Sequence, residues 1–279
     1  MAVYFLNLKN FNRAAGSSAV AAAAYRSGER LRDERRGKTY DYSERMDVLH
    51  KEIVLPALAA TLAPDWTRER SELWNAAERA ESRKNARVAR EYLVLLPHEL
   101  KPDARVELAR RFAGELSDRY GFGVDLAVHA PRPFAGSDPR NFHAHLLATT
   151  RSITAAGLGD KTEIEWHDVR RIHAGLVPSA TELLHVRRRW AEQANEALAA
   201  AGLEVRIDHR PFGRSGAETG NRPAGGEARH VPDASAQWSV GSLEDVRRRA
   251  REAWRELRMR GEPIREESRD RGIDEDLAR

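Results

Sequence analysis

The sequence predicts one α+β domain, built on a mostly antiparallel sheet of about five strands and flanked by helices, with a helical C-terminal extension. Two observations predict it. Short β-branched and aromatic segments alternate with longer segments of helical periodicity. The last two apolar segments are joined by "PRPFAGSDPRN" (131–141), a proline- and glycine-rich loop that suits a hairpin. Neighbouring antiparallel strands argue against a purely parallel sheet.

The predicted strands are short and end at turn-forming residues. The first is β-branched and aromatic, and the second and third are closed by Pro56 and Pro97. A further short strand is a candidate at 203–210. The five main strands are predicted over 3–9, 50–56, 88–97, 123–130 and 142–151.

Four segments predict helices. In the first, Ser17 or Ser18 can cap the opening turn, and the alanine run that follows has the highest helix propensity. The third has Pro102 near its start and Gly121 after its end, as helices favour. The predicted helices are 16–35, 67–86, 101–121 and 179–201.

These elements place one domain at residues 1–210. Residues 211–241 are rich in glycine, proline and serine and predict an irregular linker. Residues 242–279 predict a charged helix and a disordered polar tail.

Composition excludes several classes of site. The chain has no cysteine, so disulfides, thiolate metal sites and cysteine nucleophiles are excluded, and any metal must be held by His, Asp, Glu or water. No apolar run approaches the roughly 20 residues that span a bilayer. The first residues do not resemble a secretory signal, so we expect no membrane insertion and a cytoplasmic location. Net charge is only +4, but clustered arginines are compatible with phosphate binding.

A histidine pair is the sharpest local signal. His143 and His145 lie in "NFHAHLLATTR" (141–151), and alternate residues of a strand share one face. His129, near the end of the preceding strand, comes within cross-strand reach if its side chain lies on that same face. Three imidazoles would form a divalent-metal site with open coordination positions. The alternative is that these histidines are hydrogen-bonded structural residues. No HExxH, phosphate-loop or dinucleotide motif is present.

The histidine segment, read with "SSAVAAAAYRSGERLRDERRGKTYDY" (17–42), resembles the MobA/MobL relaxases of the HUH (His-hydrophobic-His) endonuclease superfamily. "ERSELWNAAERAESRKNARVAREYLVLLP" (69–97) and "VRIDHR" (205–210) are also similar, so the likeness covers about residues 2–210. It implies a protein that nicks and rejoins single-stranded DNA at a plasmid transfer origin. A tyrosine attacks a phosphodiester, forms a 5′-phosphotyrosine link and leaves a free 3′ hydroxyl.

By position, the resemblance implies that Tyr25 is the nucleophile and that His129, His143 and His145 bind a divalent metal, Mn or Mg. Glu91 matches an acidic residue near the metal in some relatives. Without the resemblance, Tyr25 is more simply a tyrosine that packs on a helix face.

Four basic residues are candidates for DNA contact: Arg26, Arg30, Lys38 and Arg151. Cations near the attacked phosphate would assist binding, although an arginine on a helix is usually solvated surface. The resemblance implies transfer-origin DNA as partner, together with accessory mobilisation proteins and a type IV secretion coupling protein. Two other functions stay open: an HUH-type replication initiator or transposase, and a non-catalytic origin-binding protein. A metal hydrolase of small substrates is a more distant alternative.

Overall fold

A computed structural model describes residues 2–131 and 138–209 of the chain. The chain divides into two compact units. The larger comprises Met1–Trp166 with Ala180–His230, and the smaller comprises His167–Ser179 with Val231–Arg279. The predicted linker at 211–241 and the predicted helix and tail at 242–279 lie outside the described residues, and the domain boundary at 210 stays a prediction.

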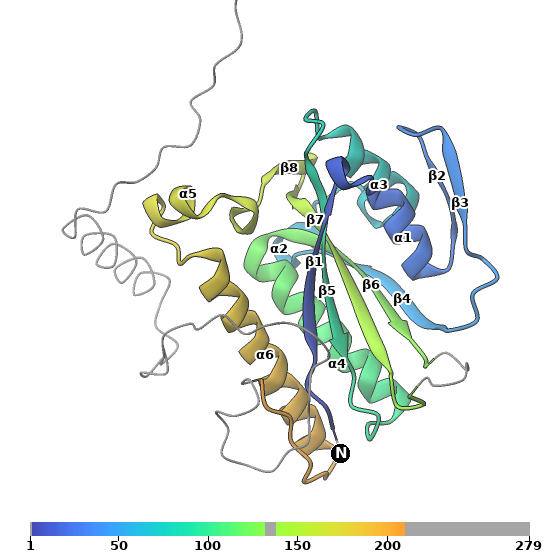
Figure 1. Cartoon of the computed structure of the whole chain (residues 1–279), viewed down its shortest axis with the longest axis vertical. Coiled ribbons are helices and arrows are strands. Elements are labelled where there is room, and N and C mark those ends of the chain that lie inside the picture. Colours follow the sequence, from blue (N-terminus) through green and yellow to red (C-terminus); the bar gives the residue numbers. More distant parts are fainter. Residues whose placement is uncertain (1, 132–137, 210–279) are drawn as a thin grey trace, which may run out of the picture. The chain divides into compact units, whose positions relative to one another are not determined.

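The larger unit contains a central antiparallel sheet (Figure 1). Its strands follow the order β1-β5-β7-β6-β4, and β8 pairs with β7. Every pairing among them is antiparallel, so the predicted fold class is confirmed. The strands are β1 (Leu6–Asn12), β4 (Val48–Val54), β5 (Arg87–Leu95), β6 (Phe122–His129), β7 (His143–Thr154) and β8 (Gly157–Lys161).

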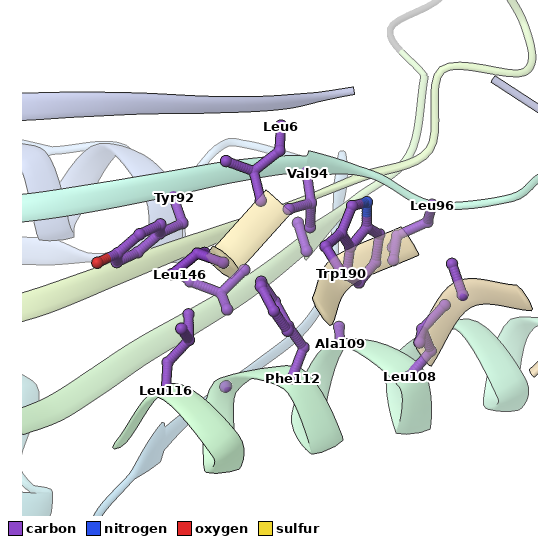
Figure 2. Close-up of a cluster of buried hydrophobic side chains, with 14 of the residues drawn as sticks. Leu6, Tyr92, Val94, Leu96, Leu108, Ala109, Phe112, Leu116, Leu146 and Trp190 are labelled. Carbon is purple, nitrogen blue, oxygen red and sulfur yellow. The ribbon is translucent and has the colours of Figure 1, made fainter. Parts of the chain in front are cut away.

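Helices cover both faces of this sheet. On one face lie α4 (Pro102–Tyr120) and α6 (Ser179–Ala200), which bury Phe112 and Trp190 against Val94 and Leu146 (Figure 2). On the other lie α1 (Ala19–Ser27) and α3 (Arg70–Arg79), with a smaller apolar cluster that includes Leu147. Because side chains alternate along a strand, adjacent residues such as Leu146 and Leu147 belong to different clusters.

The first helix is shorter than predicted. Ser18 caps α1 by accepting a hydrogen bond from the Ala21 N–H at 3.1 Å, but the helix ends at Ser27 rather than at residue 35. Gly28 follows in the left-handed conformation with φ of 63°, where a Cβ would lie 3.1 Å from Val48 Cγ2. The chain then forms a hairpin of β2 (Arg30–Asp33) and β3 (Lys38–Asp41), whose buried and exposed residues alternate in β2.

Other predictions differ in their bounds. The second predicted helix splits into a 3-10 turn, η2 (Asp65–Arg68), and α3. Strand β8 and the short α2 (Ala57–Ala60) were not predicted. The candidate strand at 203–210 is wrong for its described part, because residues 203–209 form no regular structure. The remaining 3-10 turns are η1 (Arg13–Ala15) and η3 (Glu163–Glu165).

In the smaller unit, the described residues 167–179 contain α5 (Asp168–His173). His167 is its N-cap and accepts a hydrogen bond from the Val169 N–H at 3.4 Å. Among the helices of the described residues, none has the length and apolar character needed to cross a membrane.

A candidate metal centre and the tyrosine beside it

The three histidines of the HxH motif and the preceding strand meet on one face of the sheet. His129 at the end of β6 lies directly opposite His143 at the start of β7, and His145 follows two residues later. The ring centroids are 4.7 to 5.3 Å apart. One candidate ligand nitrogen from each ring lies within 4.8 Å of the other two. The side-chain orientation required for a shared site is therefore present.

Hydrogen bonds determine which nitrogen of His129 carries the proton. Its Nε2 lies 2.7 Å from the Arg26 carbonyl oxygen, which can only accept. Its Nδ1 lies 3.2 Å from an Arg45 guanidinium nitrogen, which can only donate. Nε2 must therefore carry the hydrogen, and Nδ1 keeps the lone pair.

The other two rings are oriented in the opposite sense. The Nδ1–H of His143 donates to the Asn141 carbonyl at 2.8 Å. The Nδ1–H of His145 donates to the Glu91 carboxylate at 2.6 Å. Both rings therefore keep a lone pair on Nε2. A carboxylate or carbonyl behind each imidazole is the arrangement that orients metal-binding histidines in proteins.

The electrostatics keep the three rings neutral. Burial lowers the pKa of His129 to about 3, and the neighbouring His145 lowers it further. Burial also lowers the pKa values of His143 and His145, although hydrogen bonding to Asn141 and Glu91 opposes this. At neutral pH all three rings are unprotonated on one nitrogen, which is the form that binds metal ions.

Glu91 stands behind His145 rather than beside it as a further ligand. It lies on β5, diagonally across from His145, and its carboxylate also forms an ion pair with Arg26, whose Nη2 is 2.7 Å from Oε2. Burial alone would raise the pKa of Glu91, but the hydrogen bonds from His145 and Arg26 outweigh it and lower the pKa to about 2. The ionised carboxylate thus holds the ring of His145.

Tyr25 lies in the last turn of α1, one residue before the carbonyl that holds His129. The residue is 36% exposed, and its ring contacts Tyr42 edge-to-face, with centroids 5.2 Å apart. The guanidinium of Arg45 stacks on the ring at 4.3 Å from its centroid and donates to the Tyr25 carbonyl. The candidate nucleophile is therefore positioned by two side chains.

Sequence reasoning missed Arg45 and its partner Asp47. They lie between β3 and β4, where no periodicity or motif marks them. Arg45 forms two hydrogen bonds to the Asp47 carboxylate, at 2.8 and 2.6 Å. Because Arg45 also contacts Tyr25 and His129, it joins the tyrosine to the histidine cluster.

The four predicted DNA-contacting residues separate into two pairs. Arg26 is 9% exposed, and its donors go to Glu91 and the Ala22 carbonyl. Arg151 donates to the Glu81 side chain and to the Ala80 and Gly159 carbonyls. These placements argue against direct DNA contact by either residue.

The second pair lies on the β2–β3 hairpin. Arg30 has a side chain that is 70% exposed, and its ion pair to Asp41 is 3.5 Å long. Lys38 is exposed and lies over the Tyr40 ring at 5.1 Å. These two cations remain candidates for DNA contact.

The donor set suits a divalent ion. His129 Nδ1, His143 Nε2 and His145 Nε2 each offer a lone pair, and their second nitrogens are hydrogen-bonded. Imidazole nitrogens suit borderline ions, whereas Mg²⁺ prefers oxygen ligands. A site made of three imidazoles is therefore not typical of Mg²⁺.

Comparison with known proteins shows which family the chain resembles. A family model described as the MobA/MobL family matches residues 17–230. The mobilization protein MobL of Acidithiobacillus ferridurans is 35% identical over 268 residues, which is 89% of this chain and 67% of the relative. A probable conjugal transfer protein TraA of Sinorhizobium fredii is 32% identical over 78% of this chain, but the match spans only 20% of TraA.

A solved structure reported under the words "Molecular Basis of Vancomycin Resistance Transfer in Staphylococcus aureus" shares the fold, with a TM-score of 0.61 and 30% sequence identity. The similarity covers 76% of this chain and all of that one. Since the family model spans most of the chain and the MobL relative is matched over two thirds of its length, the chain belongs to the MobA/MobL family.

Proposed function

We propose that this protein is a conjugative relaxase that nicks and rejoins single-stranded DNA at a plasmid transfer origin. The observation that carries the proposal is the link from the three-histidine cluster to Tyr25 through Arg45. A candidate metal site joined to a partly exposed tyrosine is what a metal-assisted tyrosine transferase requires. Membership of the MobA/MobL family supports the same function.

In this proposal Tyr25 is the nucleophile. Its hydroxyl loses its proton as the oxygen attacks the phosphorus of the scissile phosphodiester, and the 3′ oxygen leaves and becomes a hydroxyl by taking up a proton. The 5′ phosphate stays joined to Tyr25, so the bond energy is conserved and rejoining needs no nucleotide cofactor. A divalent ion held by His129, His143 and His145 would stabilise negative charge on the phosphate.

The surrounding residues have supporting roles. Glu91 holds His145 in the tautomer that leaves Nε2 available, and Arg26 keeps Glu91 ionised and supplies the carbonyl that orients His129. Arg30 and Lys38 provide exposed positive charge on the hairpin that follows α1. They would contact the DNA backbone.

The proposed partner is single-stranded plasmid DNA, which places the reaction in the cytoplasm. Accessory mobilisation proteins and a type IV secretion coupling protein are proposed from the family alone. The names of the relatives describe mobilisation and conjugal transfer, which favours this function over replication initiation or transposition.

A covalent-adduct assay tests the proposal. The protein is incubated with Mn²⁺ and labelled single-stranded oligonucleotides that tile the region next to its gene, and denaturing gels reveal label attached to protein. We expect an adduct with wild type and with Tyr42→Phe, which loses a hydroxyl in the same aromatic pair, but none with Tyr25→Phe. DNA affinity of Tyr25→Phe should stay within a few-fold of wild type, because phosphate contacts dominate such interfaces.

Two outcomes would contradict the proposal. An adduct that survives in Tyr25→Phe would remove Tyr25 as nucleophile. Sequence-specific DNA binding without any adduct, in protein that binds Mn²⁺, would favour the non-catalytic origin-binding alternative.

A further inference from the structure

Arg45 uses its guanidinium group at four places at once. Its Nε and Nη2 donate to Asp47, its Nη1 donates to the Tyr25 carbonyl, its plane stacks on the Tyr25 ring, and its Nη2 also reaches His129 Nδ1 at 3.2 Å. The side chains of Arg45 and Asp47 are only 11% and 12% exposed. Arg45 is therefore held firmly, with one N–H directed at a histidine of the cluster.

The lone pair that Arg45 uses is also the one that a metal ion would need. The hydrogen on Nε2 of His129 is donated to the Arg26 carbonyl at 2.7 Å, so only Nδ1 can act as a ligand. A flip of the buried ring would break that bond. One sp² nitrogen has one lone pair, so it can accept the N–H of Arg45 or bind a metal ion, but not both.

We propose that Arg45 is a positioning residue that competes with the metal ion for His129 Nδ1 and, once displaced, presents the released N–H to a phosphate oxygen of the DNA. The inference rests on the proposed function. When Nη2 moves away from His129, Arg45 remains attached through Nε to Asp47 and through Nη1 to the Tyr25 carbonyl. Because the guanidinium contacts both His129 and the Tyr25 ring, the released N–H remains close to the candidate metal ligand and the candidate nucleophile.

This arrangement couples metal binding to DNA binding. Without metal, the N–H donor of Arg45 is already used by His129, so the site offers a phosphate one donor fewer. With metal bound, that donor becomes available, and a phosphate that accepts it disfavours the return of Arg45 to His129. Binding equilibria are reciprocal, so DNA should strengthen metal binding by the same factor.

The first test measures Mn²⁺ affinity without DNA, by calorimetry on the full chain. Arg45→Met keeps the length of the side chain but removes the competing donor and its charge, so it should bind Mn²⁺ roughly three- to ten-fold more tightly than wild type. Arg32→Met, which removes the same charge from an exposed position on β2, should bind as wild type does. Equal or weaker binding by Arg45→Met would overturn the competition.

Arg45→Lys provides the second variant, for use if Arg45→Met does not fold. It keeps the charge and can still pair with Asp47, but it lacks the forked group that reaches Asp47 and His129 together. Mn²⁺ affinity should again rise above wild type. A decrease would show that Arg45 supports the metal site, and would overturn the inference.

The second test measures DNA affinity in the Tyr25→Phe background, which prevents cutting and keeps the ring. Single-stranded DNA from the adduct assay should bind more tightly when Mn²⁺ is added, and adding Arg45→Met should remove most of that gain. If Mn²⁺ raised the DNA affinity of the Tyr25→Phe/Arg45→Met double variant as much as that of Tyr25→Phe, Arg45 would have no role in binding the phosphate. The proposed function fails if wild type neither binds Mn²⁺ nor forms an adduct. Only this inference fails if wild type does both but Arg45→Met binds Mn²⁺ with the same affinity as wild type.

Discussion

The two faces of the central sheet differ in what they do with buried residues, although the same strands supply both. Toward α4 and α6, alternate residues such as Val94, Val128 and Leu146 form a large apolar core. Toward α1 and α3, the intervening residues include Glu91, His129 and His145. The face toward α4 and α6 mainly stabilises the fold. The face toward α1 and α3 buries polar side chains at positions where apolar side chains would stabilise the fold more.

Buried charge alone does not separate the two faces. On the α4 side, Arg90 pairs with Glu165 at 2.6 Å, and the Tyr120 hydroxyl donates to Glu182 at 2.6 Å. Those groups satisfy each other within the core. In the histidine cluster, His143 and His145 are each held through Nδ1 and keep a lone pair on Nε2, whereas both nitrogens of His129 are hydrogen-bonded. A carboxylate or carbonyl behind an imidazole is a feature of metal-binding sites.

The largest expected effect comes from removing ligands. Replacing both His143 and His145 with alanine should weaken Mn²⁺ binding by more than roughly 100-fold, since loss of an outer-shell partner alone can reach that factor. DNA cutting should disappear with it. His50→Ala is the matched control, because His50 pairs with Val128 on the other face. Unchanged Mn²⁺ affinity in the double variant would remove these residues as ligands.

The neighbours Leu146 and Leu147 compare the faces directly, as both are 0% exposed. Truncating either to alanine should lower the free energy of unfolding by about 2–5 kcal/mol, measured by denaturant titration. Only Leu147→Ala should also weaken Mn²⁺ binding, because Leu147 pairs with Glu91 beneath the histidines. Equal Mn²⁺ affinities in the two variants would mean that the site is insensitive to the core below it.

Glu91→Gln should destabilise the protein by about 2 kcal/mol at neutral pH, the range for hydrogen bonds to a charged group. The folded state lowers the pKa of Glu91 from 4.5 to about 2, so its ionised form stabilises the fold above pH 4.5. That contribution is lost as the pH falls through about 2. The difference in free energy of unfolding between Glu91→Gln and wild type should therefore shrink as the pH falls from 4.5 to about 2. A difference that stays constant over this range would contradict the ion pair.

The smallest effect is expected on the hairpin. Replacing both Arg30 and Lys38 with alanine should weaken binding of single-stranded DNA several-fold and reduce the slope of log affinity against log salt by up to about 0.7 per residue. Arg151→Ala should change neither, because its donors are used within the protein. A larger effect of Arg151→Ala than of the double variant would reverse our assignment of the DNA-contacting face.

Much of the fold followed from local pattern. Short apolar segments ended by turn-forming residues predicted five of the six strands of the central sheet, and the loop at 131–141 predicted the pairing of the last two. The end of α1 was missed because Arg30 to Asp33 has good helix formers and only Gly28 interrupts them. The left-handed turn at Gly28, with Val48 against it, ends the helix there.

The sequence by itself determined that His143 and His145 share a face, because strand geometry depends only on neighbouring residues. Only the tertiary structure decided that His129 faces them, that Arg26 is buried on Glu91 rather than exposed to DNA, and that Arg45 connects Tyr25 to the cluster. Arg26 and Glu91 are 65 residues apart in the chain, and Arg45 and His129 are 84 apart. Periodicity in the sequence indicates which face of a strand a side chain is on. A hydrogen-bond partner that lies far away in the sequence is determined only by how the helices and strands pack together.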